Sequence, residues 1–164
     1  MATIKLKGNE IHTNGNPPEV GNKAPDFTLT NPQLEDVKLA DCKGTTVISV
    51  FPSIDTPVCA LSTKKFNDYA RKHPETTFMM VSVDTPFAMA RFCANEHIEN
   101  VKMLSMLRDR KFAQDYGLMI TDGPLAGVAA RAVFVLNDNH VVKHVELVDE
   151  IGKEPDYDAA FAAC

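Results

Sequence analysis

This chain of 164 residues lacks the features that mark several common classes of protein. It has no Cys-x-x-Cys pair and only four scattered cysteines, too few for a disulfide-rich secreted scaffold. No apolar run approaches the roughly 20 residues that span a bilayer. No basic stripe typical of nucleic-acid binding is present, and the alternating N-terminus lacks the apolar core of a signal peptide. We therefore expect a cytoplasmic protein that binds neither membranes nor nucleic acid.

A metal site is also poorly supported by the histidines. Five are present, and only His140 and His144 have a spacing that would place them on one face of a strand. Zinc binding needs further converging ligands, and the sequence around this pair shows none. We expect both side chains to belong to a solvated polar face, and we expect neither a metal nor another cofactor.

What remains is an ordinary globular composition. Apolar residues make up 45 % of the chain, charged residues 24 %, and the net charge of −5 is spread along the sequence. The length is typical of one domain with a real core. We therefore expect residues 1–164 to form a single domain.

Hydrophobic periodicity predicts a mixed α/β protein. An N-terminal hairpin is expected over residues 3–13 around Gly8-Asn9, followed by a loop over 14–22. The further strands are predicted at 26–30, 37–39, 46–51, 77–83, 101–105, 131–136 and 140–148. The helices are predicted at 59–72, at 86–97 from Pro86, at 109–116 with Asp109 as its cap, and from Pro155 to the C-terminus. This order favours a central mixed sheet with helices on both faces.

The most informative segment is PSIDTPVC, from Pro52 to Cys59, which joins a buried strand to a helix. In a sheet covered by helices on both faces, catalytic residues lie at the carboxyl ends of the parallel strands. A cysteine at a helix start stands in the positive field of the helix N-terminus, which stabilises the nucleophilic thiolate. A hundredfold shift of a thiol toward the thiolate requires roughly 2.7 kcal/mol. A helix end supplies about 1 to 2 kcal/mol, so a second stabilising group is needed.

The residues around Cys59 could supply part of the additional thiolate stabilisation. The Thr56 hydroxyl, three residues before Cys59, is placed to donate to the sulfur or to a bound substrate. Pro52 and Pro57 restrict the backbone of the turn. Spacing alone does not locate a positive charge. Taken by itself, Cys59 is as compatible with an inert buried thiol as with a reactive one, and Cys93 is compatible with core packing.

Several separated segments resemble one family. The spacing Pro52-x-x-x-Thr56-x-x-Cys59 is similar to the active-site motif of peroxiredoxins. The segments GNPPEVGNKAPDFTLTN, SIDTPVCALSTKKFN, PFAMARFC, DGPLAGVAARAVFVLN and EPDYDAAF resemble, in that order, the bacterial thiol peroxidases, which are atypical two-cysteine peroxiredoxins. The resemblance covers nearly the whole chain and implies a thioredoxin-like fold.

The resemblance also implies roles for individual residues. Cys59 matches the peroxidatic cysteine, which peroxide oxidises to a sulfenic acid. Thr56 matches the residue that hydrogen-bonds thiolate and peroxide, and Pro52 the proline that shields the sulfur. Arg131 matches the guanidinium of the site, which would supply the missing charge. Cys93 matches the resolving cysteine, which forms an intramolecular disulfide with Cys59.

The family further implies hydroperoxide substrates, reduction of the disulfide by a thioredoxin, and a homodimer. We expect both cysteines to lie near helix starts or first turns, where their sulfurs need not touch, and we therefore expect local unwinding before a disulfide forms. Lys64 departs from the pattern, because many members have arginine there. Asp55 is expected to be a turn residue, and Cys42 and Cys164 to have no catalytic role.

Two other functions compete with a thiol peroxidase. One is a general disulfide oxidoreductase, which the missing Cys-x-x-Cys argues against. The other is a redox sensor that passes oxidation from Cys59 to a protein partner without turnover.

Overall fold

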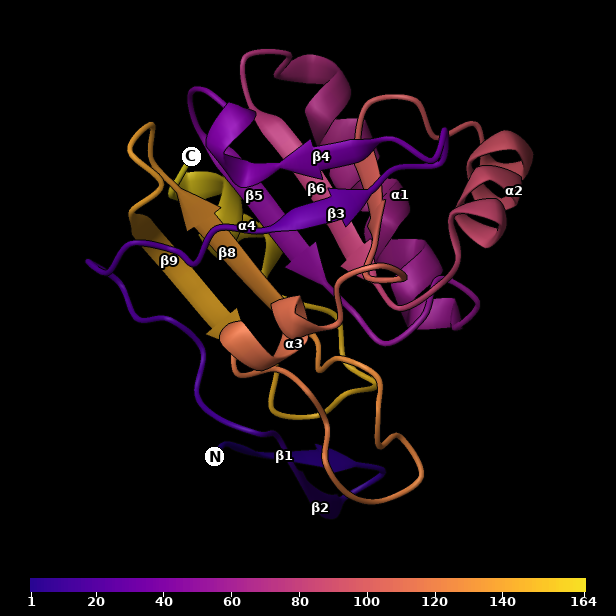
Figure 1. Cartoon of the computed structure of the whole chain (residues 1–164), viewed down its shortest axis with the longest axis vertical. Coiled ribbons are helices and arrows are strands. Elements are labelled where there is room, and N and C mark those ends of the chain that lie inside the picture. Colours follow the sequence, from indigo (N-terminus) through magenta and orange to yellow (C-terminus); the bar gives the residue numbers. More distant parts are fainter.

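The structure, a computed structural model, describes all residues from 1 to 164. Its main sheet has seven strands in the order β4-β3-β7-β6-β5-β8-β9 (Figure 1). Their bounds are β3 Thr28–Thr30, β4 Asp36–Lys38, β5 Thr46–Val50, β6 Thr77–Ser82, β7 Lys102–Ser105, β8 Ala132–Leu136 and β9 Val142–Leu147. β5, β6 and β7 are parallel, while β3 and β8 run antiparallel to their neighbours. The expected mixed sheet is confirmed.

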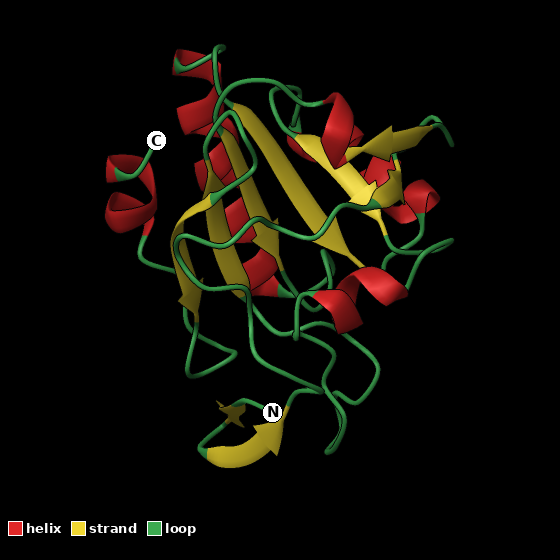
Figure 2. Cartoon of the chain, turned by 60° about the vertical axis from the view of Figure 1, so that its left-hand side comes forward, coloured by secondary structure: helices red, strands yellow, loops and turns green.

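Helices cover both faces of this sheet, as expected (Figures 1 and 2). The α-helices are α1 Pro57–Lys72, α2 Pro86–Glu96, α3 Lys111–Asp115 and α4 Tyr157–Ala162. Side chains from α1, α2 and α4 join one buried cluster, and α3 joins the other. A short 3₁₀ helix at Leu39–Asp41 was not predicted. None of the helices has both the length and the apolar character needed to cross a membrane.

The alternating direction of side chains along the central strands explains why the buried residues form two hydrophobic clusters, one on each face of the sheet. Successive strand residues point to opposite faces, and all residues of β5 and β8 are buried because both faces are covered. The face under α1, α2 and α4 carries Val47, Phe78, Met80, Met103, Val133 and Val135. The opposite face carries Ile48, Val50, Met79, Val81, Leu104, Ala132, Phe134 and Leu136.

The N-terminal hairpin forms a separate two-stranded sheet at one end of the molecule (Figure 2). Its strands are β1 Thr3–Leu6 and β2 Asn9–His12. The turn falls at Lys7-Gly8, one residue earlier than predicted. Both turn residues have positive φ, 50° and 82°, as the turns that best match hairpin twist require.

Three helix starts differ from the prediction. α4 begins at Tyr157 rather than Pro155, because Asp156 takes the N-cap position and its carboxylate accepts from the Ala159 amide. α1 begins at Pro57 rather than Cys59, because proline suits the first helical position and Thr56 takes the N-cap position. Asp109 does not cap α3. Arg110 occupies the N-cap position there, and no side chain bonds to the free amides. All three differences arise in the few residues where a helix joins its preceding turn.

Candidate active site

The sheet register brings Cys59 and Arg131 together. β8 is antiparallel to β5, and Ala132 pairs with Val50, the last residue of β5. Arg131 precedes Ala132 and therefore lies where the chain leaves β5 for the turn to α1. The Nη2 of Arg131 is 3.4 Å from the Sγ of Cys59. Two residues 72 positions apart in the chain thus meet at the carboxyl end of the central strand.

Cys59 lies in the first turn of α1, and its side chain is fully buried. The first hydrogen bond of this helix runs from the amide of Ala60 to the carbonyl of Thr56. The amides of Val58 and Cys59 precede that bond and have no partner within the helix, and Pro57 has no N–H. The local backbone therefore directs two free donors and the positive end of a helix of 16 residues toward this turn.

Arg131 is a buried cation without a carboxylate partner. Only 3 % of it is exposed, and it forms no salt bridge. The pKa of Glu154 is lowered mainly by the hydrogen bond from the Tyr157 hydroxyl at 2.7 Å, then by the Lys65 ammonium at 3.1 Å, and least by the charge of Arg131. The Nη1 of Arg131 has no hydrogen-bond partner. Because burying an unpaired charge is costly, the charge is best balanced by an anion at this site, and the Cys59 sulfur is the ionisable group that Arg131 touches.

The guanidinium is held by a backbone carbonyl. Its Nε and Nη2 donate to the carbonyl of Ile151 at 3.1 and 3.0 Å. That segment is held in turn by β1, because the amide of Lys5 donates to Asp149 and the amide of Ile151 donates to Lys5. The Gly8 amide also donates to the Glu150 carboxylate. The N-terminal hairpin therefore supports the group that orients Arg131.

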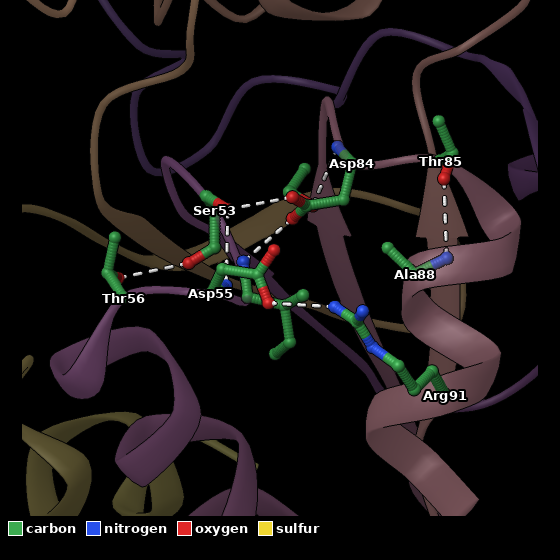
Figure 3. A network of polar contacts seen from close by, with 9 residues as sticks. Ser53, Asp55, Thr56, Asp84, Thr85, Ala88 and Arg91 are labelled. Carbon is green, nitrogen blue, oxygen red and sulfur yellow. Dashed lines mark hydrogen bonds and ion pairs between the residues drawn. The ribbon is translucent and has the colours of Figure 1, made fainter.

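Thr56 and Pro52 lie in the turn before α1. The Thr56 hydroxyl donates to the carbonyl of Ser53 at 3.0 Å (Figure 3). It does not donate to the Cys59 sulfur, which was one of the two options predicted. Because its hydrogen is used, the oxygen remains free to accept a hydrogen bond from a bound hydroxyl group. Pro52 is buried at the start of the turn.

Cys93 lies in the last turn of α2, not near a helix start as predicted. It is half-buried, and burial raises the pKa of its thiol. It contacts the same apolar cluster that contains Cys59. Cys93 also lines a cavity of about 410 Å³, which Val37, Val101 and Met103 border and Cys59 does not. Both cysteines are free thiols, so the structure describes the reduced protein.

The other two cysteines lie outside this site. Cys42 is buried after the 3₁₀ helix, and burial raises the pKa of its thiol. Cys164 is exposed at the C-terminus. Their thiols donate to the carbonyls of Lys38 and Ala160, and neither is hydrogen-bonded to an arginine or to Cys59.

The charged residues noted near the turn lie at the surface. Lys64 pairs with Glu96 at 2.9 Å and thereby links α1 to the end of α2. Asp55 lies in the turn, as expected, and receives a contact of 3.4 Å from Arg91. Both pairs are about half exposed or more, so each contributes little to stability.

The histidine pair is arranged differently from the prediction. His140 lies in the turn before β9 with φ 62°, and its Nε2 is 2.9 Å from the carbonyl of Cys42. His144 lies within β9 and is half-buried. The two residues therefore do not share a strand face. No group of three or more His, Cys, Asp or Glu side chains is arranged to hold a metal ion.

Two groups next to the site were missed by the sequence reasoning. The Ile151 carbonyl carries no side-chain signal, because any residue could provide it. Asp84 had a weak signal, since it follows the buried strand β6 at the same sheet edge as Cys59. Its carboxylate accepts hydrogen bonds from Ser53, Ile54 and Ser82.

Comparisons with known proteins agree with this geometry. Residues 19–161 match the family model described as Redoxin. The chain is 45 % identical over 164 residues to a thiol peroxidase of Corynebacterium glutamicum, covering 99 % of both proteins. It is 47 % identical to a thiol peroxidase of Mycobacterium bovis, covering 99 % of this chain and 98 % of that protein. A peroxiredoxin-like protein from Aquifex aeolicus superposes with a TM-score of 0.93 at 37 % identity, covering 99 % and 96 % of the two chains.

Proposed function

Since the chain belongs to the thiol peroxidases of the Redoxin family, we propose that it reduces hydrogen peroxide and organic hydroperoxides with Cys59 as the attacking thiol. The observation that carries this assignment is the buried Arg131 guanidinium, 3.4 Å from the Cys59 sulfur and without a carboxylate partner. A thiolate at Cys59 would balance that charge. The free amides at the start of α1 add to the same stabilisation.

In the first step the Cys59 thiolate attacks one peroxide oxygen. An S–O bond forms, the O–O bond breaks, and the other oxygen leaves with a proton as water or alcohol. The sulfur is oxidised to a sulfenic acid. The Thr56 oxygen would accept the hydrogen bond of the peroxide hydroxyl, and Arg131 would stabilise the negative charge that moves to the departing oxygen. Pro52 would exclude water from the sulfur.

In the second step the Cys93 thiol attacks the sulfenic sulfur, which forms a disulfide and releases water. The full burial of Cys59 and the position of Cys93 beside a cavity that Cys59 does not line support a local opening before this step. We infer that the first turn of α1, or the last turn of α2, unwinds to bring the two Cα atoms within about 7 Å. Exposure would also help Cys93 lose its proton, because burial raises the pKa of this thiol in the folded protein.

The cycle closes when an external dithiol reduces the Cys59–Cys93 disulfide. We propose a dithiol of the thioredoxin type, which would be oxidised as the disulfide returns to two thiols. We also propose that the protein works as a homodimer. Sedimentation of the reduced protein tests the dimer, and exchange of thioredoxin for a monothiol tests the reductant.

Steady-state peroxide consumption with thioredoxin and its reductase tests the function. The wild type and Cys42→Ser, a matched control at a buried cysteine outside the site, should turn over at equal rates. Cys59→Ser should show no turnover, and Cys93→Ser should lose turnover with thioredoxin. Sustained consumption by Cys59→Ser would exclude the proposed function. Disulfide reduction without peroxide turnover would indicate the general oxidoreductase instead, and oxidation of Cys59 without turnover would indicate the sensor.

A further inference from the structure

We propose that Asp84 is a positioning residue that holds the turn before Cys59 against the base of α2, and thereby sets the balance between peroxide reduction and disulfide formation. This inference rests on the proposed roles of Cys59 and Cys93. Its structural basis is the network of polar contacts in Figure 3, which joins the turn that precedes α1, the helix of Cys59, to α2, the helix of Cys93.

Asp84 lies between the two elements. It follows β6, the strand beside β5, and is two residues before Pro86, where α2 begins. The hydroxyl of Ser105, at the end of β7, donates to the carbonyl of Asp84. The backbone of Asp84 is therefore tied to the neighbouring strand, while its carboxylate extends toward the turn that follows β5.

The carboxylate uses both of its oxygens on that turn. Its Oδ1 accepts from the Ser53 hydroxyl at 2.7 Å, and its Oδ2 accepts from the Ile54 amide at 2.7 Å. The hydroxyl of Ser82 donates to Oδ2 at 2.6 Å. Short hydrogen bonds to an ionised carboxylate are stronger than those between neutral groups. Three such bonds converge on one side chain that is only partly exposed.

The contacts continue from Ser53 to the start of α1. The Ser53 carbonyl accepts from both the amide and the hydroxyl of Thr56, at 3.2 and 3.0 Å. Thr56 is the N-cap residue of α1, and Cys59 lies three residues beyond it. Asp84 therefore controls the orientation of Thr56 and the entry angle of α1 through one intervening residue, without touching the sulfur.

A second interaction, an ion pair between α2 and the turn before α1, is much weaker. Arg91 on α2 contacts Asp55 in the turn at 3.4 Å, with both side chains 65 % exposed. Exposed pairs of this kind contribute little. The hydrogen bonds of Asp84 therefore hold the turn in place, and replacement of Arg91 should leave the turn unchanged.

The proposal predicts opposite effects on two rates. In Asp84→Ala the Ile54 amide and the Ser53 hydroxyl lose their acceptor, so the turn loosens. The second-order rate of peroxide reduction by reduced protein should fall about tenfold, as the loss of a charge-assisted hydrogen bond allows. The first-order rate of disulfide formation should rise, because the opening that precedes it becomes easier. Asp84→Asn keeps one acceptor and should change both rates in the same directions by a smaller factor.

Rapid quench with alkylation and mass spectrometry measures the two rates separately, and two control variants and one exchange measurement define the result. Arg91→Gln should match the wild type. Val142→Ala truncates a buried residue near the opposite edge of the sheet, since Val142 pairs with Leu136 and Leu136 pairs with the first residue of β5. It should lower stability without separating the two rates. Hydrogen exchange at the Ile54 amide should accelerate in Asp84→Ala and Asp84→Asn but not in Arg91→Gln.

The outcomes are distinguishable from failure of the proposed function. If Cys59→Ser still reduces peroxide, the function is wrong, yet the exchange measurement still tests whether Asp84 holds the turn. If Cys59 is required but both Asp84 variants have wild-type rates and wild-type exchange at Ile54, the role of Asp84 is overturned. Two rates that shift in the same direction, as a general loss of stability would cause, also overturn it.

Discussion

Replacement of Arg131 by methionine should separate activity from stability. In the folded protein this guanidinium donates to the Ile151 carbonyl twice and to the Cys59 sulfur once, with 3 % of the residue exposed. Methionine has a similar length but neither charge nor donors. The thiolate would lose its one cationic partner, and the Ile151 carbonyl would lose two donors.

Arg131→Met should greatly lower the rate of peroxide reduction. A hydrogen bond to a charged group contributes about 1.5 to 3 kcal/mol. At about 1.4 kcal/mol for each factor of ten, its loss lowers the rate of peroxide reduction roughly 10- to 150-fold. Arg131→Lys keeps the charge but not the planar fork, so it should retain more activity than Arg131→Met.

Arg131→Met should change the free energy of unfolding only slightly, because two effects oppose each other. An unbonded buried carbonyl costs about 1 to 3 kcal/mol. Removal of a buried cation that has no carboxylate partner also removes its desolvation penalty, which partly offsets that loss of stability. Arg131→Met should therefore unfold in urea within about 2 kcal/mol of the wild type, although its activity has largely been lost.

Stopped-flow kinetics with reduced protein and urea unfolding of the same preparations measure the two quantities. Arg108→Met is the matched control, because Arg108 is 53 % exposed and paired with Asp36 outside the site. It should keep the wild-type rate. If folded Arg131→Met reacts with peroxide within threefold of the wild type, the charge argument is refuted.

Three further predictions concern single side chains. Thr56→Val keeps the shape of the turn but loses the hydroxyl, so peroxide reduction should fall about five- to tenfold, and Thr56→Ser should restore most of it in stopped-flow assays. In Cys59→Ser, alkylation of Cys93 followed by mass spectrometry should keep rising with pH beyond the point at which a small free thiol levels off, because burial raises the pKa of Cys93; a plateau at the same pH would contradict the burial argument. Phe66 is fully buried on α1 and packs against Phe78 and Phe161, so Phe66→Ala should lower the free energy of unfolding by about 3 to 5 kcal/mol in urea. A loss below about 1 kcal/mol would mean that the α1 contact is not part of the core.

Local patterns were sufficient to predict where Cys59 would lie. The apolar run of β5, the two prolines and the helical period after them describe a strand, a turn and a helix, and the structure has these elements within two residues. The position at the carboxyl end of a parallel strand followed from the alternation of strands and helices. These features depend on neighbouring residues, which the sequence displays directly.

Contacts across the sheet were not predictable from spacing. Arg131 reaches Cys59 because β8 pairs with β5 in one antiparallel register, and a pairing register depends on the packing of both strands. The family resemblance suggested the arginine, but no local pattern did. The Ile151 carbonyl and the Asp84 network likewise depend on where a loop or strand end lies relative to distant residues. The Thr56 bond to Ser53 was missed because a hydroxyl at an N-cap has several partners within reach.

The most direct test of the account is peptide mapping after a single turnover. Reduced protein would be mixed with one equivalent of hydrogen peroxide, quenched with an alkylating reagent, digested without reductant and analysed by mass spectrometry. The account predicts one dominant product, a disulfide between the peptides of Cys59 and Cys93, and a sulfenic acid at Cys59 when Cys93 is replaced by serine. Oxidation at Cys42 or Cys164 with Cys59 still a free thiol would contradict it.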